Sequence, residues 1–409
     1  MKPAAMPAAM PATYDGREQA YVKHSLLKAY LQALLMIMGL SSGAKGREVE
    51  LCFVDCFAGP WQSEDDDLSG TSIALSLEIL SKCKSELARM GVSTRMRALY
   101  VEKDKTAFGR LKTFIERQQG GPVEAECYEG DFLDLRGAIL DWCGPKPFCF
   151  FFIDPKGFKE IGVTQLAPLL ERKRSEFLIN FMYMFVNRAA SIDELKTIMV
   201  ELLGTEIDLR GLGPDEREDY LLSCYRAGLV AKVSGSSGTG YPPRSAYARI
   251  LDSKKERVKY HLVYVTSHPK GIVKFMEASE SAERVQRTVR EHVHFQSREQ
   301  SQRMGDMFAD EVRAPEAAAR AAGQEIDEFW LRYLENGSRA IGLDDFASVL
   351  EETDYFPGEL QASLRSLIDA KLIVNEAEKR RRGSKPLHYD DNETLRITPE
   401  GLIALRDSQ

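Results

Sequence analysis

Several residues and patterns that mark particular protein classes are scarce or missing in this sequence. It has 7 Cys and 6 His among 409 residues, and its longest apolar run, residues 29–40, is shorter than the roughly 20 residues of a membrane span. The phosphate-binding signature G-x-x-x-x-G-K-[ST] is absent, which excludes a P-loop nucleotide site. A formal net charge of −7 argues against indiscriminate coating of nucleic acid.

The first residues also lack the continuous apolar segment of a secretion signal. They read MKPAAMPAAMPATYDG, with repeated Pro and one Lys, so we expect residues 1–16 to form a flexible tail. An odd number of cysteines without such a signal indicates free thiols in a reducing compartment. We therefore expect a cytoplasmic protein that does not enter a membrane. A hydrophobic share of 44% with 29% charged residues indicates an ordinary globular chain.

Short apolar runs alternate with amphipathic segments through the first half of the chain. The predicted strands are residues 51–55, 97–102, 123–131, 147–154 and 175–184, and the predicted helices between them are 71–90, 103–119, 132–142 and 162–173. Continuous apolar strands separated by helices are typical of an α/β, doubly wound, Rossmann-like parallel sheet. Two further strands, 245–253 and 258–267, are joined by KKER and are expected to pair antiparallel.

The remaining segments define the predicted domain plan. Residues 17–48 are N-terminal helices with apolar residues at helical spacing, and 49–275 form the α/β domain. Within that domain, 187–240 are a helical insertion or lid. Residues 276–322 are a helical connector, and 323–409 have the helix and hairpin order of a winged helix. The tip of its hairpin is basic, with Lys379, Arg380, Arg381, Arg382 and Lys385.

Acidic residues stand where three of the predicted strands end. Ligands of parallel α/β sheets bind at the carboxyl ends of the strands. The first strand runs into Asp55-Cys56-Phe57-Ala58-Gly59-Pro60, a turn that lets the backbone pass close to a nucleoside. The second ends in Glu102-Lys103, and a carboxylate there can accept both ribose hydroxyls. The third ends before Asp131-Phe132, where Asp131 could accept from an adenine amino group with Phe132 beside the ring. Each acid alone could be a surface or capping residue, but three in order are hard to explain by chance.

The fourth strand carries the most specific pattern, FFFI followed by Asp154-Pro155-Lys156-Gly157-Phe158. The carboxylate of Asp154 and the carbonyl of Pro155 can both accept from a planar amino group, and Phe158 could stack on a base. The alternative is a turn in which Pro and Gly only reverse the chain. Lys23 and His24, on the first helix, could close over the bound ligand, although His24 could also be an ordinary surface residue.

At these motifs the chain resembles a class I methyltransferase that uses S-adenosylmethionine. Asp-x-Phe-x-Gly is similar to the cofactor motif of DNA methyltransferases, and Asp-Pro-Lys-Gly-Phe to the Asp-Pro-Pro-Tyr motif of amino methyltransferases. More narrowly, most of residues 17–280 resemble the three-Cys-motif partner protein family, TcmP. The segments that carry this likeness are YVKH, DCFAGP, YVEKD, FFIDPKGF, INFMYMFVNR and YHLVYVTSHPKGIVKFME. The resemblance implies S-adenosylmethionine as cofactor and a Cys-motif metalloenzyme, encoded nearby, as a partner.

The residues favour some chemistries over others. Cytosine C5 methylation needs a Cys after Pro in the fourth-strand loop, where this chain has Asp154 before Pro155. Cys52 and Cys56 alternate along the first strand and are expected in the core. No metal-ligand set is predicted. We expect methylation of an amino group on nucleic acid, since the basic tip could meet a phosphate backbone. The alternatives are a peptide or protein acceptor, favoured by the acidic run Glu64–Asp67, and a non-catalytic binding module. The oligomeric state is not predicted.

Overall fold

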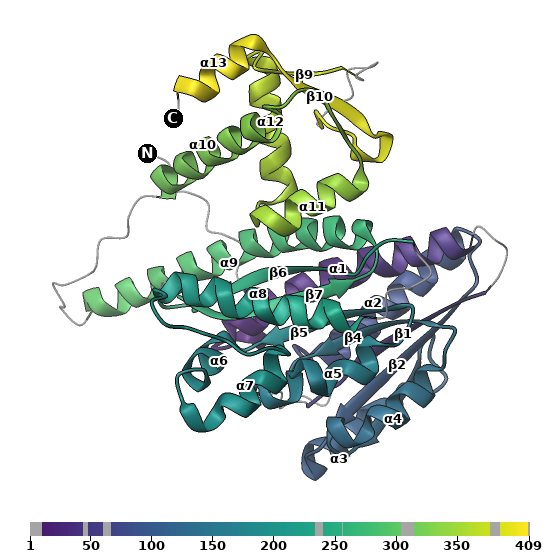
Figure 1. Cartoon of the computed structure of the whole chain (residues 1–409). Helices are drawn as coiled ribbons and strands as arrows, with labels where there is room; N and C mark the ends of the chain where they lie inside the picture. The colour runs from purple at the N-terminus through teal and green to yellow at the C-terminus, as the bar shows by residue number, and fades with distance from the viewer. Residues whose placement is uncertain are drawn as a thin grey trace. The chain divides into compact units, whose positions relative to one another are not determined.

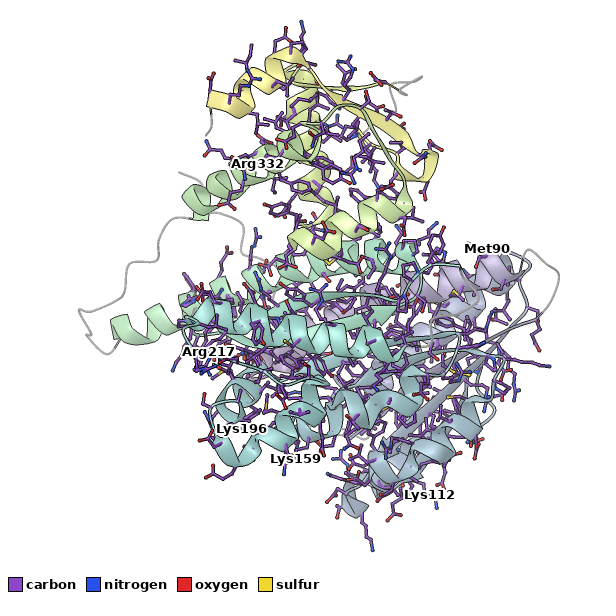
Figure 2. The ribbon with its side chains drawn as sticks, viewed as in Figure 1. Met90, Lys112, Lys159, Lys196, Arg217 and Arg332 are labelled. Carbon is purple, nitrogen blue, oxygen red and sulfur yellow. The ribbon has the colours of Figure 1, made fainter. Side chains whose placement is uncertain are left out.

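The computed structural model describes residues 10–43, 48–59, 67–233, 240–255, 257–303, 315–376 and 385–407. The chain divides into two compact units, Met1–His294 and Phe295–Gln409, which are described separately below (Figure 1). Basic side chains lie on the outer surface of the first unit, among them Lys112 on α3 (Lys105–Arg117) and Lys196 at the start of α7 (Lys196–Leu203) (Figure 2).

The first unit is a three-layer α/β structure. Its strands are β1 (Val49–Asp55), β2 (Thr94–Glu102), β3 (Glu124–Glu129), β4 (Phe148–Ile153), β5 (Ser175–Phe181), β6 (Arg244–Leu251) and β7 (Val258–Thr266). Besides α3 and α7, its helices are α1 (Glu18–Gly43), α2 (Ser72–Arg89), α4 (Phe132–Cys143), α5 (Val163–Leu170), α6 (Tyr183–Ala189), α8 (Pro214–Lys232) and α9 (Pro269–Arg303), the last of which continues past residue 294.

All seven strands form one sheet in the order β3-β2-β1-β4-β5-β7-β6. The pairs among β1 to β5 are parallel, whereas β7 pairs antiparallel with both β5 and β6. The predicted α/β fold and the antiparallel hairpin are therefore confirmed. This strand order, with β7 reversed, is typical of the methyltransferase type of Rossmann fold. The order changes direction between β1 and β4, which is the place where such sheets bind ligands.

Successive side chains along each strand point to opposite faces of the sheet and pack in two separate layers. Residues such as Val54, Phe151 and Phe177 pack in the layer that contains α4, α5, α7 and α8; α5, α7 and α8 lie together on one side of the sheet (Figure 1). Residues one step along each strand, such as Phe53 and Phe150, point to the opposite layer, where Phe150 contacts Tyr30 of α1. Every strand of the centre is thus buried on both faces, as continuous apolar runs require.

Helix α1 is long and apolar enough, by length and composition alone, to cross a membrane. Its apolar face is buried: Leu26, Leu27, Tyr30 and Leu31 have no exposed surface, and the helix packs against α2. This packing accounts for its composition. Residues 12–14, which the sequence assigned to a flexible tail, form a short 3-10 helix with Tyr14 buried.

The second unit contains α10 (Pro315–Tyr333), β8 (Arg339–Ile341), α11 (Leu343–Thr353), α12 (Pro357–Asp369), β9 (Ile373–Asn375), β10 (Glu393–Ile397) and α13 (Pro399–Asp407). Its small sheet has the order β8-β10-β9 and is antiparallel. The short strand β8 was not expected. Trp330 is fully buried and donates from Nε1 to the Leu360 carbonyl oxygen at 3.1 Å. The assignment as a winged helix stays a prediction, and Lys379–Arg382 of its basic tip lie outside the described residues.

Close packing of α8 on α7 predicts opposite effects for two glycine substitutions. A Cβ at Gly228 would lie 2.3 Å from the Leu203 carbonyl oxygen, whereas a Cβ at Gly109 in α3 would meet nothing within 4 Å. We expect Gly228→Ala to destabilise the fold by about 1–3 kcal/mol and Gly109→Ala to stabilise it by about 0.5–1 kcal/mol. Urea unfolding followed by circular dichroism measures both. Equal shifts in the same direction would contradict the packing described.

Candidate active site

The carboxyl ends of β1 and β4 adjoin at the change of strand order. Asp55, the last residue of β1, is paired in register with Phe152 of β4, so Asp154 follows just beyond it. Both side chains belong to the face of the sheet that packs against α1, because Asp55 is two residues after Phe53 and Asp154 two after Phe152. The sheet therefore brings two predicted acids to one place.

Asp55 is fully buried and fixes the turn after β1. Its Oδ1 accepts from the Phe57 amide at 3.1 Å and its Oδ2 from the Ser72 hydroxyl at 2.6 Å. Burial raises the pKa of this carboxyl to about 7, since the two hydrogen bonds offset only part of the desolvation. Asp55 therefore shapes the loop and the start of α2.

The turn itself lies against the end of β2. Ala58 donates its amide to the Val101 carbonyl oxygen at 2.8 Å and is fully buried. Gly59 is half-buried and is the last described residue before a gap. Pro60, predicted to be in the same turn, lies outside the described residues. The backbone of residues 56–59 therefore passes between the ends of β1 and β2.

Glu102 ends β2 as a nearly buried carboxylate, 4% exposed. Its Oε1 accepts from the Asp104 amide at 2.6 Å, while Oε2 has no partner among the described residues. Lys103 is exposed, and its Nζ lies 3.5 Å from Oδ2 of Asp131. One oxygen of Glu102 thus remains available at the sheet edge.

Asp131 is the N-cap of α4, since its Oδ1 accepts from the Leu133 amide at 3.0 Å. The next residue, Phe132, is buried and contacts the half-exposed Phe57, with 5.1 Å between ring centroids. Phe57, rather than Phe132, therefore presents ring surface toward the edge of the sheet. The capping role of Asp131 leaves its Oδ2 for Lys103 or a ligand.

Asp154 is held from two directions. Lys23 of α1 forms an ion pair with its Oδ2, and Asn180 at the end of β5 donates from Nδ2 to its Oδ1 at 2.7 Å. The side chains of Lys23 and Asp154 are 12% and 20% exposed. The predicted proximity of Lys23 to the site is therefore a direct contact with Asp154.

Asn180 was not among the residues chosen from the sequence. It is 4% exposed, and its Oδ1 has no hydrogen-bond partner among the described residues. A buried carbonyl oxygen without a donor costs about 1–3 kcal/mol. Its position in the otherwise apolar run FLINF was the signal available, because a polar residue there must be paired or functional.

His24 is buried, which neither of the predictions for it had proposed. Its Nδ1 lies 3.0 Å from the Tyr14 hydroxyl, and burial next to Lys23 lowers its pKa to about 3. His24 is thus a neutral ring at physiological pH. Arg17 donates to the Gly70 carbonyl oxygen at 2.6 Å, so residues 14–24 are attached to the loop before α2.

The other predicted residues after β4 have supporting positions. Pro155 is buried, and Phe158 is half-buried against the core layer of α4 and α5. Burial raises the pKa of the Cys56 and Cys149 thiols above their ordinary value, which disfavours a thiolate nucleophile. Among the described residues, no group of three or more His, Cys, Asp or Glu could hold a metal ion.

No protein-family model matches the chain, and no curated protein is significantly similar to it. Solved structures give distant likenesses only. A protein of Porphyromonas gingivalis W83 assigned as a methyltransferase is 12% identical with a TM-score of 0.22, over 38% of this chain and 34% of that one. The O-methyltransferase of Bacillus cereus in complex with SAH is 15% identical with a TM-score of 0.31, over 64% and 84%. Precorrin-6y C5,15-methyltransferase of Geobacter metallireducens GS-15 is 12% identical with a TM-score of 0.22, over 57% and 84%. Membership of the TcmP family stays a prediction.

The neutral state of His24 predicts a pH dependence of stability. Folding lowers its pKa from about 6.5 to about 3, so the unfolded chain binds more protons as the pH falls below 6.5. We expect His24 to cost roughly 2 kcal/mol of stability at pH 5 relative to pH 8. Urea unfolding at both pH values measures this cost, and His24→Gln should reduce the difference. A His24 NMR resonance that titrates near pH 6.5 in the folded protein would contradict the assignment.

Proposed function

We propose that this chain is an S-adenosylmethionine-dependent methyltransferase that acts on a neutral, planar amino group of nucleic acid. The observation that carries the proposal is the pair of acceptors at the carboxyl edge of the sheet, the nearly buried Asn180 and the partly buried Asp154, which are joined by a hydrogen bond. Glu102 ends β2 and Asp131 caps α4 just after β3, at the same carboxyl edge, where such sheets hold a nucleoside.

The residues that the sequence predicted to bind the cofactor fit S-adenosylmethionine. The available Oε2 of Glu102 can accept from ribose hydroxyls, and Oδ2 of Asp131 can accept from an adenine amino group. The half-exposed ring of Phe57 offers a face for the base. When bound, S-adenosylmethionine supplies an already activated methyl group, so the protein mainly contributes alignment, which can supply roughly 7–11 kcal/mol of the barrier.

The polarity of the acceptor pair selects an amino group that carries N–H donors. Oδ1 of Asn180 lacks a donor, and Asp154 can accept a second hydrogen bond beside the one from Asn180. The ion pair with Lys23 already compensates the charge of Asp154. A neutral amino group therefore fits better than an ammonium ion. Two accepted N–H bonds would aim the nitrogen lone pair away from Asp154, and Asp154 would collect the proton released after transfer.

Nucleic acid is the acceptor that this chemistry favours, because exocyclic amino groups of bases are neutral and planar. The predicted winged helix and its basic tip would supply contacts to phosphates. A peptide is the second candidate, since the loop before α2 and the segment after β4 carry acids such as Asp67 and Glu160, which would repel phosphate. In that case a Cys-motif metalloenzyme would be the partner, and both would work in the cytoplasm.

Cofactor affinity should depend on Glu102. Glu102→Ala removes the carboxylate that would accept hydrogen bonds from the ribose hydroxyls, each worth about 1.5–3 kcal/mol, so we expect S-adenosylhomocysteine to bind at least tenfold more weakly. Calorimetry on the folded variant tests this. Glu201→Ala, which changes an exposed acid on α7, should leave affinity unchanged. Equal affinity in both variants would remove Glu102 from the site.

Turnover should depend on Asp154 more than cofactor binding does. Asp154→Asn keeps the shape of the side chain but weakens the acceptor and removes a base, so we expect about a 10²-fold loss of turnover or more with near-normal binding of S-adenosylhomocysteine. The measurement is transfer of a labelled methyl group to DNA, RNA and peptides encoded nearby.

The acceptor screen separates the candidates. Label in nucleic acid that disappears with Asp154→Asn supports the proposal, and label in a peptide supports the second candidate. Lys23→Met serves as a matched variant, because it leaves Asp154 in place but uncompensated. Full turnover by Asp154→Asn would exclude Asp154 from the mechanism, and binding of S-adenosylhomocysteine without transfer to any acceptor would favour a binding module.

A further inference from the structure

A cavity lies at the opposite edge of the sheet from Asp154. It measures about 360 Å³, within the range of small-molecule sites. Its walls come from the first residues of β4 and β5, from the end of β7, from α1 and from the first turns of α9. The cavity is therefore separated from the candidate active site by the length of the central strands, and no role in methyl transfer accounts for it.

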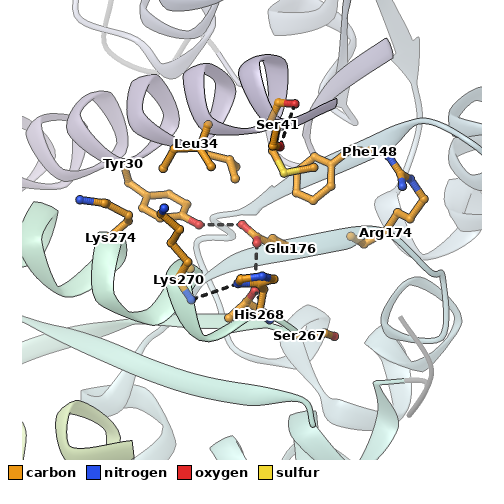
Figure 3. A pocket seen from close by; sticks show the side chains of 15 residues that line it. Tyr30, Leu34, Ser41, Phe148, Arg174, Glu176, Ser267, His268, Lys270 and Lys274 are labelled. Atoms are coloured by element: carbon orange, nitrogen blue, oxygen red, sulfur yellow. Dashed lines mark hydrogen bonds between the residues drawn. The ribbon is translucent and has the colours of Figure 1, made fainter. Parts of the chain in front are cut away.

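One side of the cavity is apolar. Leu34, Ile37 and Met38 of α1 face it together with Phe148 of β4. Figure 3 shows Leu34 and Phe148 on the side formed by α1. A surface of this kind excludes water-soluble polar molecules and favours the hydrocarbon or aromatic part of a ligand.

The floor is polar but already satisfied. Glu176 is 6% exposed; its Oε2 accepts from the Tyr30 hydroxyl at 2.6 Å and its Oε1 from the Thr266 hydroxyl at 2.9 Å. Burial raises the pKa of this carboxyl. Because both oxygens of Glu176 already accept hydrogen bonds, we do not expect Glu176 to require a cationic ligand.

The rim is cationic. Arg174, Lys270 and Lys274 line the cavity, and Figure 3 shows Arg174 and Lys270 on either side of Glu176. Lys274 forms an ion pair with Glu277 at 2.6 Å. The side chains of Arg174 and Lys270 have no acidic partner among the described residues. Burial, together with the nearby charge of Lys270, lowers the pKa of His268.

We propose that this cavity binds a small amphipathic anion, with its apolar chain or ring along α1 and its carboxylate or phosphate between Arg174 and Lys270. Charge complementarity with these two cations selects the anionic head, and the apolar wall selects the body. Gly271 lets the first turn of α9 approach closely, since a Cβ there would lie 2.5 Å from the Tyr264 hydroxyl oxygen. The wall formed by α9 thus depends on the close contact between Gly271 and Tyr264, which a larger residue would prevent. The proposal does not rest on the methyltransferase function.

Calorimetry on the full chain tests the proposal with four probes that share one hydrocarbon body: octanoate, octyl phosphate, octanol and octylamine. We expect saturable one-to-one binding of octanoate or octyl phosphate, and about tenfold weaker binding of octanol and octylamine. The comparison of the two anions tells carboxylate from phosphate. Binding of octylamine as tight as that of either anion, or absence of saturable anion binding, would overturn the proposal.

Three variants locate the binding. Met38→Trp fills the cavity and should abolish binding of every probe, whereas Arg174→Gln with Lys270→Gln should weaken the anions about tenfold and leave octanol unchanged. Lys112→Gln on α3, far from the cavity in sequence and exposed (Figure 2), is the matched control and should change nothing. Ile37→Phe replaces Met38→Trp if the latter does not fold. Unchanged anion binding in the filled and charge-neutralised variants would place the probes elsewhere and refute the site.

Discussion

Compensation of charge at the ends of β1 and β4 is the constraint on which the arrangement of the first unit depends. Adjacent strands place Asp55 and Asp154 close enough for Asp154 to raise the pKa of Asp55 and for Lys23 to lower it. Two carboxylates in a partly desolvated place are costly unless a cation or hydrogen-bond donors accompany them. The donors for Asp55 come from its own turn and from Ser72. The cation for Asp154 has to come from outside the sheet, and α1 supplies it.

Helix α1 therefore does more than cover the sheet. Lys23 lies at the edge with Asp154, and Tyr30, about two helical turns later, lies at the edge with Glu176. On β5 the same geometry recurs, because Glu176 and Asn180 share one face near opposite ends of the strand. The period of the helix and the period of the strand thus place one polar contact at each edge of the sheet, Lys23 with Asp154 at one and Tyr30 with Glu176 at the other. Any shift of α1 along its axis would disturb both.

The sequence predicts the strands and the acids at their ends well, and the long-range partners poorly. Continuous apolar runs mark buried parallel strands, so the five parallel strands and the hairpin were evident from the residue pattern alone. The pattern does not reveal their order in the sheet, because nothing local specifies which strands pair. The contact between Lys23 and Asp154 and the burial of His24 could likewise not be predicted, since each depends on where α1 packs against the sheet. Asn180 carried a local signal, an amide within an apolar strand, but its partner could be known only from the fold.

The groups at the two edges of the sheet differ in whether the protein supplies a donor for each oxygen. Asp55 and Glu176 use both oxygens on donors of the protein, which stabilises the turn after β1 and the contact of α1 with β5. Asn180 retains a buried oxygen without a donor, and Glu102 retains one oxygen at the sheet edge. The free energy that an unpaired buried oxygen costs, about 1–3 kcal/mol, is recovered when a ligand supplies the N–H. Such groups favour the bound state over the free state, so the residues that are least satisfied in the folded chain are those best placed to recognise what it binds.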